Sequence, residues 1–291
     1  MANEDIIATI RQRKSVRTFE KRPLTNDDRA TVQALMAAVD NPFGVDVRLH
    51  LLEAGASGEK LSTYGVVRDA SAYIGAETVW QPLAPLALGY QLESFVLGAT
   101  ACGLGSVWLG GTFKRAAFAK AMGVAEDRWF PVVIPIGYAA RRRSTAERAL
   151  RHVTKADERE MWRDLFTQDG FQVQLSEEAA ESYAVPLEML RLAPSAANGQ
   201  PWRVVKCGNL FHFYETHKPS LGQEQVRLRH IDLGIGIAHF EGNATTQLLL
   251  LGRGARIGLL VLPGCLGILA DGHGGIAPTE GFVDTATGLA P

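Results

Sequence analysis

The sequence has few of the features that mark several large classes of protein. Only three of its 291 residues are cysteine, and they are far apart, so neither a disulfide framework nor a cysteine metal site is indicated. Basic and acidic residues nearly balance at a net charge of −1, which argues against nucleic acid as a partner. We therefore expect a protein of a reducing compartment, without a structural metal.

Long uninterrupted apolar runs are also missing. The most apolar stretches are residues 83–101, which Glu93 interrupts, and 248–269, which contains two arginines and several glycines. Neither offers the roughly 20 consecutive apolar residues that a transmembrane helix needs, so both are interpreted as core. Residues 1–13 are mixed and charged, unlike a secretory signal. The expectation is a cytoplasmic protein without a membrane partner.

Sequence motifs for several kinds of catalysis are absent as well. The chain has no Gly-x-Ser-x-Gly, no His-Glu-x-x-His and no Gly-x-Gly-x-x-Gly. Gly103 and Gly105 follow a predicted helix rather than a strand, so they indicate a helix end and not a dinucleotide loop. His239, within a later helical stretch, is interpreted as a packed core histidine. No protein nucleophile and no metal site are predicted.

Alternation and helical periodicity divide the chain into an α+β pattern. Helices are predicted at 5–13, 25–39, 83–101, 114–122, 148–166, 176–179 and 187–192 and from 231 onward, and strands at 45–53, 73–76, 131–138, 203–207 and 210–215. The charged helix 148–166 is interpreted as a connector. Thr25, with Asp28 three residues on, is predicted to cap the second helix.

The two long helices can be aligned, with Leu88-Gly89 over Leu233-Gly234 and Ala99-Thr100 over Ala244-Thr245. This predicts two repeats, 1–166 and 167–291, each a small sheet flanked by helices. Chance similarity between two Ala/Gly/Leu helices is the alternative. No lysine follows Lys218, and beyond about residue 250 the sequence is rich in glycine, leucine, alanine and proline without a clear period. That tail fits poor order, a divergent end or a reading-frame error equally well.

Three short strings favour ligand binding. Arg13, Ser15 and Arg17 alternate, so on an extended segment they would offer two guanidinium groups and a hydroxyl to one anionic ligand. A solvated basic run is the alternative. The loop 194–202, Pro-Ser-Ala-Ala-Asn-Gly-Gln-Pro-Trp, is constrained and polar, which is typical of a binding loop. Gly110 and Gly111 would let a backbone lie flat against a ligand.

Together these strings resemble the FMN-dependent nitroreductase family over most of residues 5–245. In that family an N-terminal Arg-x-Ser-x-Arg grips FMN, and a Pro-Ser-x-x-Asn-x-Gln-Pro-Trp loop lines the flavin across a dimer seam. The stretch 103–111 resembles the family's segment beside the reactive flavin edge, and 135–143 its final strand and phosphate-binding basic residues. The resemblance implies an FMN site made of Arg13, Lys14, Ser15, Arg17, Trp108, Leu109, Gly110, Gly111, Arg141, Arg142, Arg143, Pro194, Ser195, Ala196, Asn198 and Gln200.

The arrangement of these motifs is similar to the TM1586-type branch, in which two repeats are fused into a pseudo-dimer. The first half has Arg-x-Ser-x-Arg but no Pro-Ser loop, and the second half has the reverse. The resemblance thus implies a monomer with one FMN per chain. It also implies that NAD(P)H reduces the flavin, that a small nitroaromatic, quinone or similar acceptor reoxidises it, and that no protein side chain is a catalytic nucleophile.

Roles for single residues also follow from the resemblance. Arg13 or Arg17 would lie near the flavin N1 edge, and the other, with one of Arg141–Arg143, on the phosphate. Backbone N–H groups of Gly110 and Gly111 would face N5, while Ser195 and Asn198 would bond to the flavin from the second repeat. A non-catalytic flavin- or nucleotide-binding protein is the main alternative, and reductive dehalogenation or flavin cleavage is a third possibility.

Overall fold

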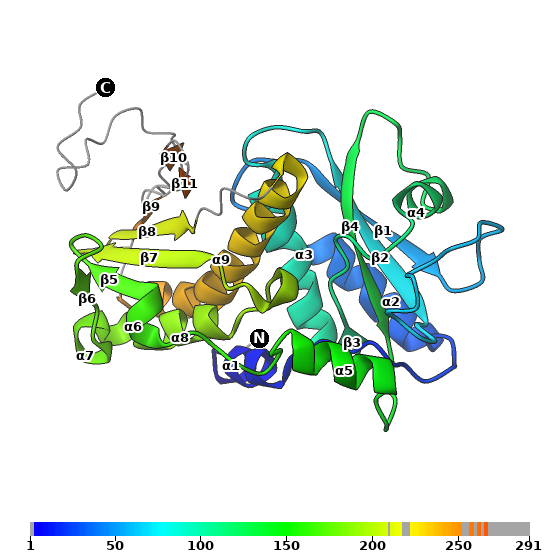
Figure 1. Ribbon diagram of the computed structural model, residues 1–291, viewed down its shortest axis with the longest axis horizontal. Coiled ribbons are helices and arrows are strands. Elements are labelled where there is room, and N and C mark those ends of the chain that lie inside the picture. The colour runs from blue at the N-terminus through cyan, green and yellow to red at the C-terminus, as the bar shows by residue number, and fades with distance from the viewer. Residues whose placement is uncertain are drawn as a thin grey trace.

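Two long helices pack against each other at the centre of the molecule, and each comes from a different half of the chain (Figure 1). They are α3 (Ala84–Ala101) and α9 (Gln223–Leu251) in this computed structural model of the protein. The structure describes residues 3–208, 210–216, 222–251, 256–258, 261–262 and 265–266. A β-sheet lies on each side of the helix pair, so the layout is α+β with two main sheets.

The first half of the chain forms a four-stranded antiparallel sheet in the order β1-β2-β4-β3. The inner strands are almost entirely buried, because β-branched and small residues occupy both of their faces. The elements of this half, besides α3, are α1 (Asn3–Gln12), α2 (Asn26–Ala38), β1 (Val47–Glu53), β2 (Ala72–Thr78), β3 (Gly105–Ser106), α4 (Arg115–Ala121), β4 (Trp129–Gly137) and α5 (Thr145–Val153).

The second half forms a mixed sheet in the order β6-β5-β7-β8-β9, in which β5 and β7 are parallel and β7 and β8 are antiparallel. A separate pair, β10 and β11, follows. The elements, besides α9, are α6 (Trp162–Leu165), β5 (Phe166–Gln168), β6 (Val173–Gln174), α7 (Glu177–Ala180), the 3₁₀ helix η1 (Glu181–Tyr183), α8 (Ala184–Leu192), the 3₁₀ helix η2 (Ala196–Asn198), β7 (Trp202–Cys207), β8 (Leu210–Glu215), β9 (Arg256–Gly258), β10 (Val261–Leu262) and β11 (Cys265–Leu266).

Local sequence signals account for several helix ends. Thr25 caps α2 as predicted, since its Oγ1 accepts a hydrogen bond from the Asp28 N–H at 3.1 Å. At the end of α3, Gly103 takes a left-handed φ of +81°. Its N–H bonds to the Thr100 carbonyl, and the Leu104 N–H bonds to the Ala99 carbonyl, both at 2.9 Å. This Schellman arrangement stops the helix and turns the chain into β3.

The central helices touch through a reciprocal glycine contact. A Cβ atom added to Gly89 on α3 would lie 2.2 Å from the Ile231 carbonyl oxygen on α9. A Cβ atom added to Gly234 on α9 would lie 2.2 Å from the Leu86 carbonyl oxygen on α3. Each glycine therefore meets the carbonyl three residues before the other glycine. A contact in which two helices use equivalent residues in this way is expected when the helices are related by a two-fold axis. The two glycines are also the ones that the sequence alignment places over each other.

Two predicted elements differ most from the structure. The connector 148–166 is not one helix, because α5 ends at Val153 and an irregular segment leads to the one-turn helix α6. Lys155 in that segment has a positive φ of 48°, which continuous helix does not allow. The last long helix begins at Gln223 rather than 231. The predictions for the tail fall almost entirely outside the described residues, and the repeat boundary at 166/167 stays a prediction.

Within the described ranges, no helix combines the length and the apolarity needed to cross a membrane. The same part of the chain contains no group of three or more His, Cys, Asp or Glu side chains placed to hold a metal ion. His239 is fully buried, which confirms its prediction as a core histidine.

Candidate functional site

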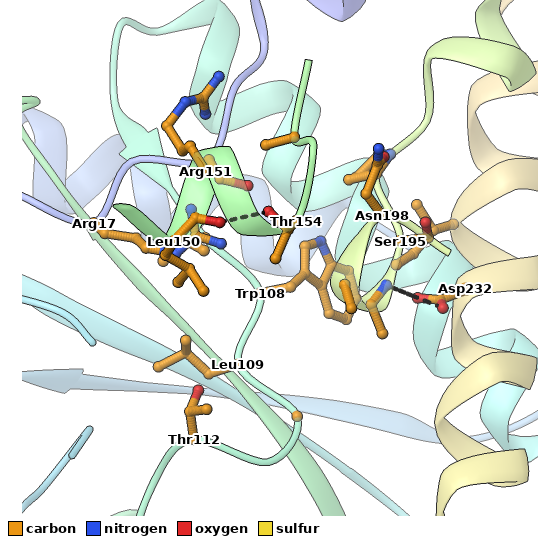
Figure 2. A pocket seen from close by; sticks show the side chains of 18 of the residues that line it. Arg17, Trp108, Leu109, Thr112, Leu150, Arg151, Thr154, Ser195, Asn198 and Asp232 are labelled. Carbon is orange, nitrogen blue, oxygen red and sulfur yellow. Dashed lines mark hydrogen bonds between the residues drawn. The ribbon is translucent and has the colours of Figure 1, made fainter. Parts of the chain in front are cut away.

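A cavity of about 340 Å³ opens between the two halves of the chain. This volume is within the range of ligand pockets, about 300–1,000 Å³. Five segments form most of its wall: the extended stretch after α1, the loop after β3, the end of α5 with the segment that follows it, the loop before β7, and the first part of α9. In Figure 2, Arg17 and Arg151 lie on one side, Ser195, Asn198 and Asp232 on the other, and Trp108 between them.

The stretch after α1 is extended and points its polar side chains into the cavity. The Val16 N–H bonds to the Ser106 carbonyl at 2.8 Å, which fixes the stretch against β3. Val16 is buried on the other side and packs on Gly105, where a Cβ atom would come within 2.9 Å of it. Arg13, Ser15 and Arg17 therefore share the cavity side, as the alternation predicts, and Lys14 also lines the wall.

The cavity is strongly cationic. Five cationic side chains line it against two carboxyl groups; the cations are Arg13, Lys14, Arg17, Arg151 and Arg159. Burial lowers the pKa of Arg13, Arg17 and Arg159; nearby carboxylates oppose this shift and neighbouring arginines add to it. Three of these guanidinium groups have buried nitrogen atoms without a hydrogen-bond partner: Nη1 of Arg13, Nε and Nη1 of Arg17, and Nε of Arg159.

Such atoms are costly to bury, because each has lost water and gained no acceptor. An anionic group in the cavity would supply acceptors to several of them at once. The wall is thus suited to a ligand with a phosphate or another delocalised negative charge.

The loop before β7 is held in an unusual backbone conformation. Ala197, Asn198 and Gln200 have φ values of 51°, 57° and 40°, while Gly199 has an ordinary φ of −74°. Hydrogen bonds hold this strain: the Gln200 N–H donates to Ser195 Oγ at 2.9 Å, and Gln200 Oε1 accepts from the Glu160 N–H at 2.9 Å. The Ser195 hydroxyl keeps its own hydrogen available toward the cavity.

Asn198 ties this loop to the segment after α5. Its Nδ2 donates to the carbonyls of Lys155 and Glu158 at 2.8 and 3.0 Å, and its Oδ1 accepts from Arg159 Nη1 at 3.3 Å. The side chain is therefore committed to protein partners. It places Arg159 on the cavity wall rather than offering an amide to a ligand.

The loop after β3 forms the floor of the cavity. Leu109 exchanges backbone hydrogen bonds with Val133 of β4 at 3.0 and 3.1 Å, which anchors the loop. A Cβ atom on Gly110 would lie 3.2 Å from Leu228 of α9, so glycine allows close approach there. No atom lies within 4 Å of a Cβ built on Gly111, which leaves its backbone open.

Asp232, on α9, is a carboxyl in the same wall. It is 5% exposed, and both of its oxygens accept from the Ala196 N–H, at 3.0 and 3.1 Å. Burial raises the pKa of Asp232 to about 8, against the opposing effects of that hydrogen bond and of Arg229. Near neutral pH the group is therefore largely protonated and does not cancel the positive charge of the cavity.

The comparisons with known proteins agree with this architecture. The sequence pattern of a family described as "Putative TM nitroreductase" matches residues 5–244, which is most of the chain. The chain belongs to this nitroreductase family. The predicted TM1586-type resemblance is thereby confirmed. No curated protein matches the chain.

The family match and the solved structure described next confirm the nitroreductase-like α+β fold. The TM1586 nitroreductase of Thermotoga maritima is 21% identical with a TM-score of 0.58, over 91% of this chain and 93% of that one. A nitroreductase with bound FMN from Desulfitobacterium hafniense is 17% identical with a TM-score of 0.39, over 48% of this chain and 91% of that one. One from Bacteroides fragilis, also with bound FMN, is 16% identical with a TM-score of 0.39, over 48% and 90%.

Most of the predicted site residues of this nitroreductase-family chain meet at the cavity, although they lie up to about 180 positions apart. They are Arg13, Lys14, Ser15, Arg17, Trp108, Leu109, Gly110, Gly111, Pro194, Ser195, Ala196 and Asn198. Gln200 is not part of the wall. It is 4% exposed and supports the loop from behind through Glu160.

Arg141, Arg142 and Arg143 do not line the cavity either, although their position after β4 predicted a phosphate contact. All three are exposed, and Arg143 lies 3.6 Å from the carboxylate of Glu147 on α5. Ser144 caps α5 directly after them, so the chain reverses before it reaches the cavity. Arg151 and Arg159 occupy the wall instead. Arg151, Arg159 and Asp232 do not belong to a recognisable sequence motif. The sequence also gives no glycine or proline to mark the break between helices at 154–161.

Proposed function

We propose that this chain is an FMN-dependent oxidoreductase of the nitroreductase type, with one FMN per chain in the cavity between its halves. The observation that carries the proposal is the set of buried guanidinium nitrogens without partners, on three arginines of one wall. FMN fits this chemistry, since it joins an anionic phosphate to a flat ring that needs a close, polar surface. Two solved nitroreductases similar to this chain contain bound FMN, which supports the same cofactor.

When bound, FMN would accept a hydride from NAD(P)H and pass electrons to a small acceptor such as a nitroaromatic or a quinone. The residues of this chain bind and orient it. Arg13, Arg17, Arg151 and Arg159 would neutralise negative charge on the cofactor, in place of the predicted Arg141–Arg143. The open backbone at Gly111 and the hydroxyl of Ser195 would supply further donors, while apolar residues of α9 exclude water.

The proposal of a monomeric pseudo-dimer with one site rests on where the wall residues come from. Arg13 and Arg17 belong to the first half, whereas Ser195, Asn198 and Asp232 belong to the second. A single chain therefore provides both sides of the cavity. Purified protein should contain close to one FMN per chain and should run as a monomer in light scattering. A ratio near two flavins per chain would contradict this arrangement.

Binding of FMN is tested by titrating flavin-free protein and following quenching of flavin fluorescence. Arg17→Ala should weaken FMN binding by about 10-fold to 100-fold, because a charge-assisted hydrogen bond to a buried group contributes about 1.5–3 kcal/mol. Arg148→Ala is the matched control. Arg148 lies on α5, one turn before Arg151, but it is exposed and outside the cavity wall. Equal FMN affinity in wild type and Arg17→Ala would contradict the assignment of Arg17 as an FMN-binding residue.

The competing function is that of a non-catalytic flavin- or nucleotide-binding protein on the same scaffold. Anaerobic addition of NADH or NADPH separates the two. An oxidoreductase loses its flavin absorbance and regains it when a nitroaromatic or quinone is added, whereas a binding protein keeps its absorbance throughout.

A further inference from the structure

The carboxylate of Glu93 lies in the middle of α3, fully buried among apolar residues. Three side chains converge on it. Trp108 Nε1 donates to Oε2 at 2.7 Å, His239 Nε2 lies 2.8 Å from Oε1, and Arg13 Nε lies 3.9 Å from Oε1. These four residues, Arg13, Glu93, Trp108 and His239, are called the Glu93 cluster below. They join the N-terminal stretch and the cavity loop to α9, across the seam between the halves.

The hydrogen bonds of His239 determine how many protons the Glu93 cluster holds. His239 Nδ1 lies 3.2 Å from the Met189 carbonyl oxygen, and a carbonyl can only accept, so Nδ1 carries a hydrogen. The contact between His239 Nε2 and Glu93 then needs one more proton. Either Nε2 carries it and faces a carboxylate, or Glu93 carries it and donates to Nε2. In both forms the histidine and the glutamate together have no net charge.

This neutrality matters for Arg13. The guanidinium group has a 5% exposed side chain, lines the cavity, and has a buried Nη1 without a hydrogen-bond partner. If Glu93 were an uncompensated carboxylate, it would pair with Arg13 and cancel its charge, because a lone buried charge is very costly. With the proton on the Glu93–His239 pair, the cluster keeps the full positive charge of Arg13.

We propose that His239 is a positioning residue for ligand binding: it neutralises Glu93, so that Arg13 stays available to an anionic ligand in the cavity. Glu93 in turn holds the Trp108 ring on the cavity floor through the indole N–H. His239 does not line the cavity, and it acts through Glu93. The inference rests on the proposed function in so far as the anion is FMN.

Three variants test this with FMN affinity as the readout. Glu93→Gln keeps the pattern of donors and acceptors without a charge: its amide donates to a neutral His239, and its carbonyl accepts from Trp108. Its FMN dissociation constant should stay within about 3-fold of wild type. His239→Gln leaves Glu93 charged beside a neutral partner, and should weaken FMN binding about 10-fold or more. The double variant should return to within about 3-fold of wild type.

Two results overturn the inference: a large loss of affinity in Glu93→Gln, or a double variant no better than His239→Gln. Loss of packing alone gives no rescue, because the double variant removes the same imidazole. A second readout does not depend on FMN. In urea unfolding of the flavin-free protein, His239→Gln should be less stable than the double variant. Absence of FMN binding in wild type would refute the proposed function, while the unfolding comparison would still decide the role of His239.

Discussion

The reciprocal contact between α3 and α9 predicts a large cost for a single methyl group. A Cβ atom at Gly89 or at Gly234 would lie 2.2 Å from a backbone carbonyl oxygen of the other helix. Ordinary contact begins near 3.4 Å, so the helices must separate by roughly 1.2 Å, since backbone atoms cannot rotate away. Overpacking of this kind costs about 1–3 kcal/mol or more, against a gain of about 1 kcal/mol from replacing a helical glycine by alanine.

We therefore expect Gly89→Ala and Gly234→Ala each to lower the free energy of unfolding by about 1–2 kcal/mol, which is a fall in Tm of roughly 2–8 °C. Urea and thermal unfolding followed by circular dichroism measure this. The double variant should cost less than the sum, because one separation of the helices relieves both clashes.

Gly242→Ala is the matched control on the same helix. Its Cβ atom would lie 3.7 Å from the nearest atom of Ile6, which is ordinary contact. That variant should be unchanged or more stable by up to about 1 kcal/mol. Stability of Gly89→Ala and Gly234→Ala within error of wild type would refute the contact and, with it, the two-fold packing of the helices.

Three further predictions concern polar side chains that form hydrogen bonds or ion pairs in the second half of the chain. Burial raises the pKa of Asp232 to about 8, so its stabilising contribution is complete below its unfolded pKa of about 4 and is lost as the pH rises toward 8. Asp232→Asn should therefore gain stability relative to wild type between pH 5 and 8 in urea unfolding; a pH-independent difference would exclude this. Asn198→Ala should lower the free energy of unfolding by about 2–3 kcal/mol, since it removes three side-chain hydrogen bonds and places alanine at a φ of 57°. Asn198→Gly should lower it less in the same urea assay, because glycine adopts this φ readily. Arg229→Met should lower the free energy of unfolding by about 3 kcal/mol, because it removes an ion-pair partner at 2.6 Å from the buried Glu215. An unchanged urea midpoint would argue against this ion pair.

Local signals in the sequence were sufficient for much of the fold. The strand at 210–215 and the helix at 114–122 are found where alternation and periodicity predict them, within one residue. Gly103 ends α3 because only its own neighbours are needed to form the Schellman turn. The predictions failed where the chain reverses without glycine or proline. Lys155 adopts a positive φ in the middle of a helix-like sequence, and no neighbouring residue type predicts this conformation.

The candidate site, too, was predicted from the sequence only in part. Short motifs identified the extended stretch at Arg13–Arg17 and the loop at 194–202 from residue types alone. They did not indicate Arg151 and Arg159, which line the cavity, whereas Arg141–Arg143 lie outside its wall, directly before the cap of α5 at Ser144. Arg151 reaches the cavity from the last turn of α5, and Arg159 from the following segment, which Asn198 holds through hydrogen bonds.

The sequence by itself determined most of the secondary structure, the resemblance to nitroreductases and the motifs of the candidate site, because these depend on residues within a few positions of one another. Tertiary structure alone decided the charge of that site. Glu93 is neutralised by a histidine 146 positions away, and Asp232 is held protonated by burial under a loop from another element. Electrostatic energies depend on distance and burial in space, and the packing of α3 on α9 sets both.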